Sequence, residues 1–205
     1  MPSFDLKIIS CFFIFFICSS CEKRNEKTAF IQEKMPTIPA VEIATNDVDL
    51  ERKNGLFYLK NELFSGTIIE KYPNDQIKKT TACFKGERFG KMLLWYADGR
   101  LAQTRFYRKN QKHGTHKGFW PNGEPKFVYH FINGKYEGEY KEWHSNGKLF
   151  KLQHFENGIE IGSQQAWEAT GKVKFNYVVR EGRRYGLVGT KTCEKVENPY
   201  SKNEN

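Results

Sequence analysis

Side chains that could do chemistry are scattered along this 205-residue chain, and their spacing argues against catalysis. No serine, cysteine or threonine lies in a nucleophile-type turn with a matching histidine and aspartate, and no glycine-rich phosphate loop is present. His130 and His154 are 24 residues apart. On successive hairpins they would stand about 9.6 Å apart, too far to share one metal ion. We therefore expect a non-enzymatic protein without metal, cofactor or small-molecule substrate.

Aromatic and basic side chains are more informative. Phe, Tyr and Trp make up 15% of the chain, and the net charge is +9. Residues 66–125 hold 12 Lys and Arg against 5 Asp and Glu. A basic surface with exposed rings attracts acidic or phosphate-bearing partners, whereas a solvated face without a specific partner is the alternative. The candidate binding residues are Trp95, Tyr96, Phe119, Trp120, Tyr140, Trp143, Trp167, Arg105 and Arg108.

A 24-residue repeat positions these side chains. Its first glycine recurs without a slip as Gly66, Gly90, Gly114, Gly138, Gly162 and Gly186. Most copies contain an aromatic strand, a turn such as Asn146-Gly147, a second strand, and another turn such as Asn157-Gly158. Asn-Gly and Asp-Gly pairs are strong hairpin signals, and no segment shows a helical period. The repeat predicts an all-β fold, a single-layer antiparallel β-meander of five 24-residue hairpin repeats over residues 66–190.

The rings occupy fixed places in each repeat. Trp95 and Trp143 stand five residues after the first glycine, and the next position should point to the opposite face. Cys83, Tyr107 and Phe131, seventeen residues in, should share one face. The rings then either pack as ladders within the sheet or meet a partner. A flat sheet offers no deep, dry pocket for acid–base chemistry.

The repeated pattern of glycine, aromatic residue and turn glycine, as in GEYKEWHSNGKLFKLQHFENG from Gly138, resembles the MORN-repeat variant of bacterial lipoproteins and YwqK-family antitoxins. The resemblance covers roughly residues 55–190, and Lys71, Asp75 and Asn110 depart from it. It implies a twisted single-layer sheet with a concave, aromatic-lined groove. It also implies contact with membranes or phospholipids and a role in protein scaffolding, and it supplies no catalytic residues.

The N-terminal segment is typical of an export signal. An apolar stretch, residues 8–20, follows Lys7 and is shorter than the roughly 20 residues of a membrane-spanning helix. Cys18-Ser19-Ser20-Cys21 resembles a bacterial lipobox with Cys21 as the lipidated residue, and an uncleaved or simply secreted form is the alternative. Because Glu22 follows, the resemblance implies lipid anchoring at the cell outer membrane.

These signals divide the chain into five parts. They are a lipoprotein-type signal peptide (1–20), a flexible tether (21–45), an entry hairpin (46–65), the MORN-like repeats (66–190) and a polar tail (191–205). After the signal and the lipidated Cys21, only Cys83 and Cys193 remain. They should lie on the order of 40 Å apart, which predicts two free thiols, with Cys83 in the core.

Three functions follow from this organisation. The first is a repeat-scaffold lipoprotein of the cell envelope that binds a protein partner or an anionic membrane surface through an aromatic and basic face. The second is an antitoxin-type inhibitor of a partner toxin, which the export signal disfavours. Nucleic acid binding ranks last because an exported chain rarely meets nucleic acid, although rings and basic charge would permit stacking.

Overall fold

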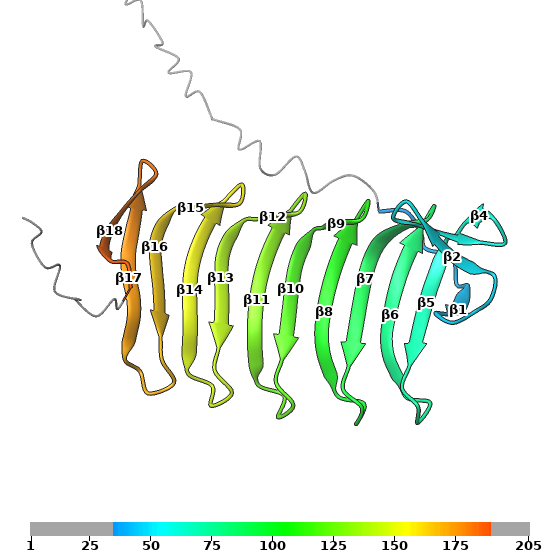
Figure 1. Ribbon diagram of the computed structural model, residues 1–205, viewed down its shortest axis with the longest axis horizontal. Coiled ribbons are helices and arrows are strands. Elements are labelled where there is room, and N and C mark those ends of the chain that lie inside the picture. Colours follow the sequence, from blue (N-terminus) through cyan, green and yellow to red (C-terminus); the bar gives the residue numbers. More distant parts are fainter. Residues whose placement is uncertain (1–34, 190–205) are drawn as a thin grey trace, which may run out of the picture. The chain divides into compact units, whose positions relative to one another are not determined.

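The computed structural model describes residues 35–189 as β-strands and turns without a helix (Figure 1). All of these strands belong to the compact unit Pro36–Asn205. Within the described residues, no helix is long and apolar enough to cross a membrane. The main sheet consists of β1 (Glu42–Ala44), β5 (Gly66–Lys71), β6 (Ile77–Phe84), β7 (Glu87–Trp95), β8 (Leu101–Arg108), β9 (Gln111–Lys112), β10 (Gly114–Phe119), β11 (Pro125–Ile132), β12 (Lys135–Tyr136), β13 (Gly138–Trp143), β14 (Leu149–Glu156), β15 (Ile159–Glu160), β16 (Gly162–Trp167), β17 (Val173–Arg180) and β18 (Arg183–Leu187).

Successive hairpins follow one another along this sheet in chain order. The repeats form the pairs β5–β6, β7–β8, β10–β11, β13–β14 and β16–β17. In their registers a glycine faces a ring across the strands, as in Gly90–Tyr107 and Gly114–Phe131. The predicted all-β meander of hairpin repeats is therefore confirmed. One strand departs from it, because β1 pairs parallel with β5 at the N-terminal edge.

Two different turns alternate at the two ends of the strands. At one end, Asp98 Oδ1 accepts a bond from Arg100 N at 3.0 Å, and only the following Gly99 has a positive φ, +84°. At the other end, Asn133 and Gly134 both have positive φ, 48° and 82°, as in two-residue type I′ hairpins. The Asp-Gly and Asn-Gly pairs of the first end are therefore Asx-type turns, because the side-chain oxygen caps the backbone.

Hydrogen bonds join each hairpin to the next at both ends of the strands. At the Asx-turn end, a side chain reaches a carbonyl oxygen of the next repeat. These contacts are Tyr72–Trp95 (2.9 Å), Tyr96–Phe119 (2.7 Å), Trp120–Trp143 (3.2 Å) and His144–Trp167 (2.9 Å). At the opposite end, the Gly134 amide donates to the Lys112 carbonyl at 2.8 Å. This linkage explains the constant period, since one inserted residue would move the donor off its acceptor.

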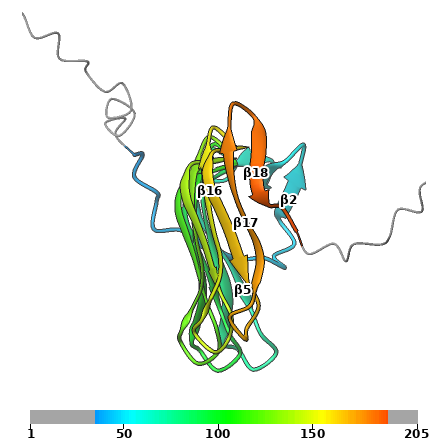
Figure 2. The same cartoon turned by 90° about the vertical axis from the view of Figure 1, so that its left-hand side faces the viewer.

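A small second sheet covers the start of the main one. The cap, defined as β2 (Leu50–Lys53), β3 (Leu56–Leu59) and β4 (Glu62–Leu63), lies to one side of the curved main sheet (Figure 2). Leu50, Phe57 and Leu59 pack against a core of Phe64, Ile68 and Cys83. Cys83 is fully buried, which confirms its predicted core position, whereas Cys193 lies outside the described residues.

Candidate binding face

Strand register places a row of rings on one side of the main sheet. We call this side the aromatic face, and we call the other side, which carries Lys117, Val128 and Lys141, the opposite face. The cap lies on the aromatic face. Ile68 belongs to the core against which the cap packs, and strand register places Ile68 and Thr81 on the same side of the sheet as Met92 and Arg105. Its ring-bearing members are Tyr107, His116, Phe127, Tyr129, Phe131, Tyr140, Phe155, Phe175 and Tyr177.

Ring contacts run across several strands of this face. His116 lies 5.7 Å from Tyr107 and 4.6 Å from Phe131, measured between ring centroids. Tyr129 and Tyr140 stack at 4.2 Å. Because glycines face some of these rings, the rings lean over the gaps and touch their neighbours. The face therefore acquires the side-to-side packing that a single layer needs.

A carboxylate anchors the centre of the row. Glu142 Oε1 accepts a bond from Tyr129 at 2.5 Å and another from Tyr140, and Glu142 lies 3.5 Å from Lys151 Nζ. Burial, and then the hydrogen bond to Glu142, raises the pKa of both tyrosine hydroxyls. Both hydroxyls therefore stay protonated and donate to Glu142. The carboxylate of Glu142 is thus occupied by the two tyrosines and Lys151.

Basic side chains on the aromatic face differ between its two halves. Arg88 lies 4.5 Å from the Tyr107 ring centroid and donates to Asn110, while Arg105 Nε donates to Gln103 at 2.9 Å. Neither has a carboxylate partner among residues 35–189. In the C-terminal half, Lys151 pairs with Glu142 and Arg184 pairs with Glu160 at 2.9 Å. Uncompensated positive charge therefore gathers toward the N-terminal half.

The predicted binding residues separate into groups. Arg105 and Tyr140 lie on the aromatic face. Tyr96 and Trp120 lie at the Asx-turn end, where their polar atoms bond to the next repeat. Those two side chains therefore join neighbouring repeats through hydrogen bonds, a role that the sequence did not suggest.

The remaining predicted residues lie at strand ends. Trp95, Phe119, Trp143 and Trp167 end their strands at register shifts and are half-buried. No tryptophan ring contacts another aromatic ring within the described part of the chain, so other ring positions supply the ring contacts. Arg108 ends β8, and its charge, after burial, lowers the pKa of His113.

Sequence reasoning missed Arg88 and Tyr129 as members of this face. The available signal was the two-residue alternation counted from Gly90 and Phe131, which places Arg88 and Tyr129 on the same side as Tyr107.

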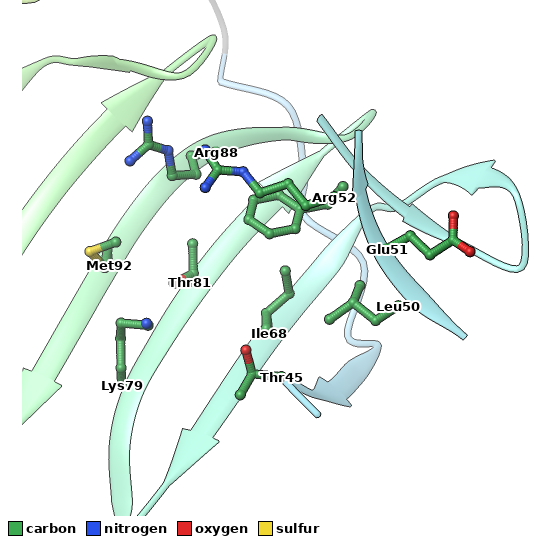
Figure 3. A pocket seen from close by; sticks show the side chains of 10 residues that line it. Thr45, Leu50, Glu51, Arg52, Ile68, Lys79, Thr81, Arg88 and Met92 are labelled. Atoms are coloured by element: carbon green, nitrogen blue, oxygen red, sulfur yellow. The ribbon is translucent and has the colours of Figure 1, made fainter. Parts of the chain in front are cut away.

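A cavity of about 430 Å³ lies between the cap and the aromatic face (Figure 3). This cavity exists because the cap overhangs the sheet, and it is partly open and lined by charged side chains. Three cationic side chains line the cavity, Arg52, Lys79 and Arg88. Among residues 35–189, no group of His, Cys, Asp and Glu side chains could hold a metal ion.

The comparison with known families agrees with this geometry. Residues 112–133 and 136–157 match the MORN repeat variant, and they span the hairpins β10–β11 and β13–β14. The match supports a MORN-type repeat architecture for these two hairpins, as in a repeat scaffold. No curated protein matches the chain.

Proposed function

We propose that this chain is a non-enzymatic scaffold that binds an acidic protein partner through the N-terminal half of the aromatic face. The observation that carries the proposal is the pair Arg88 and Arg105, which lie beside a row of rings without a carboxylate partner among the described residues. Arginine and aromatic side chains are the residue types that most often supply binding energy at protein interfaces. An acidic partner would supply the missing counter-charges.

Adjacent residues on β8 allow a test of which face binds. Gln103 belongs to the aromatic face and Thr104 to the opposite face. A photo-crosslinking amino acid at position 103 of the full chain should capture a discrete acidic protein, and one at position 104 should not. Arg105→Glu should reduce the capture at least tenfold, whereas Lys117→Glu on the opposite face should leave it within about twofold. Equal capture from positions 103 and 104 contradicts the proposal.

An anionic membrane is the alternative partner for the same charge. Co-sedimentation with vesicles distinguishes a membrane partner from a protein partner. The full chain, without its lipid modification, is mixed with vesicles that contain or lack anionic lipid. Binding that needs anionic lipid, disappears at high salt and depends on Arg105 would replace the protein partner with a membrane surface.

We further propose that the scaffold is held at the outer membrane by a lipid on Cys21. The support is the lipobox-like run Cys18-Ser19-Ser20-Cys21 after an apolar segment of signal length. Growth with an alkyne-tagged fatty acid should label the wild-type chain in the outer-membrane fraction. Cys21→Ser should abolish the label, and Cys193→Ser should retain it. Retained labelling of Cys21→Ser contradicts the anchor without affecting the binding proposal.

A further inference from the structure

The cavity under the cap has walls of two kinds. From the repeat sheet come Lys79, Thr81, Arg88 and Met92, and from the cap comes Arg52. In Figure 3, Arg52 extends from β2 toward Arg88, while the carboxylate of Glu51, a residue that also lines the cavity, lies on the far side of β2. Glu51 pairs with Lys53, on the side of β2 away from Arg52. The acidic neighbour of Arg52 in the sequence is thus directed elsewhere.

The three cations of the cavity differ in how far they are neutralised. Lys79 bonds to Glu70, which also holds Lys78 at 2.7 Å. Arg52 and Arg88 have no carboxylate partner among residues 35–189. Arg52 lies 5.4 Å from the centroid of the Phe57 ring, and Arg88 lies 4.5 Å from that of Tyr107. These rings hold the two guanidinium groups in place without compensating their charge.

The remaining lining is suited to a small organic body. Ile68, Phe57 and Met92 supply apolar surface, and Thr81 adds a hydroxyl group. A volume of about 430 Å³ falls within the range of small-molecule sites, which combine apolar walls with a few polar groups. Two like charges in a partly enclosed space repel each other, and an anion between them relieves that repulsion.

We propose that this cavity binds a small organic oxyanion, a carboxylate or a phosphate monoester, with Arg52 and Arg88 holding the charged group and Met92 and Phe57 contacting the apolar body. Planar guanidinium groups bind both oxyanions through paired hydrogen bonds. The site shares Arg88 with the protein-binding surface proposed above, but Arg52 belongs to the anion site alone and Arg105 does not line it, so the anion site does not depend on a protein partner. Because Arg52 belongs to the cap, the site exists only where the cap covers the repeat sheet.

Calorimetric titration of the full chain with four probes tests the proposal. Butyl phosphate and pentanoate carry the two oxyanions on the same butyl chain, butanol lacks the charge, and inorganic phosphate lacks the apolar part. We expect at least one of the two butyl oxyanions to bind at least tenfold more tightly than butanol and inorganic phosphate. The better butyl probe identifies the oxyanion. Failure of both to bind, or equal binding of butanol or inorganic phosphate, overturns the proposal.

Two variants and two controls locate the site. Arg52→Gln and Arg88→Gln should each weaken binding of the better probe at least tenfold. Lys53 follows Arg52 in β2, and its side chain points to the opposite side of that strand. Lys53→Gln should therefore leave binding within about twofold. If Arg52→Gln, with unchanged thermal unfolding, binds as well as Lys53→Gln, the assignment is overturned. Arg105→Gln should retain the anion while losing the protein partner, so the failures of the two proposals are distinguishable.

Discussion

The two ends of the main sheet are built differently. At the N-terminal end, the cap covers the first hairpin, and Phe64, Ile68 and Cys83 are at most 4% exposed. At the C-terminal end, every residue of β18 is exposed, including Tyr185 at 55% and Leu187 at 45%. A single layer buries side chains mainly against neighbouring hairpins, so an end hairpin lacks half of its contacts. The comparison shows that the core at the N-terminal end is completed by the cap and not by the repeat itself.

The largest predicted effect is the loss of the core under the cap. Phe64→Ala should lower the free energy of unfolding by about 3–5 kcal/mol, because it removes a buried ring and leaves a cavity. Urea unfolding followed by circular dichroism measures this change. Val48→Ala, at a side chain that is 93% exposed, is the matched control and should have little effect. If the two variants lose similar stability, the cap does not hold the N-terminal end.

Alkaline pH should weaken the capped end through Cys83. Burial raises the pKa of its thiol from 9.0 to about 12. The thiol is protonated in both states below pH 9, so its contribution to stability is complete there. Between about pH 9 and pH 12 the unfolded chain releases the proton first, and this contribution falls. From pH 8 to pH 10, Cys83→Ala should therefore lose less stability than the wild type. Cys193→Ala is the control, and a slope for Cys83→Ala equal to that of Cys193→Ala would contradict the effect.

The repeat sheet could be predicted from sequence because its signals are local and periodic. The spacing of Gly90, Gly114 and Gly138 sets the hairpin register, and Asn133-Gly134 predicts its own turn. The cap site could not be predicted in this way. Asn54-Gly55 predicts a hairpin, but only contacts between Phe57 and the core under the cap determine which face it covers. The cavity and the position of Arg52 follow from that docking.

The Asx-type turns show a second limit of sequence reasoning. Asn122-Gly123 and Asn157-Gly158 are the same dipeptide, yet only Asn157 has a positive φ. Asn122 Oδ1 instead accepts a bond from Glu124 N at 3.1 Å. The number of residues between the paired strand ends determines which of the two turns forms. The Asn-Gly dipeptide alone does not reveal this loop length.

The links between repeats should be weaker than the core under the cap but measurable. Tyr96→Phe removes the 2.7 Å bond to the Phe119 carbonyl and should cost about 1 kcal/mol. Hydrogen exchange should show faster opening of β10, the strand that accepts this bond. Tyr185→Phe alters an exposed hydroxyl at the uncapped end and is the control. An effect of Tyr96→Phe no larger than that of Tyr185→Phe would mean that the bond adds no stability.

The smallest effects separate the two kinds of turn. Asn133 has a φ of 48°, so Asn133→Gly should be tolerated, because glycine adopts this conformation readily. Asn122→Gly instead loses the bond from the Glu124 amide and should cost about 0.5 kcal/mol, as expected for an exposed hydrogen bond. Thermal unfolding of the two single variants, with wild type as reference, measures the difference. If Asn133→Gly is the more destabilising substitution, the two ends of the strands do not differ in the way that their backbone angles require.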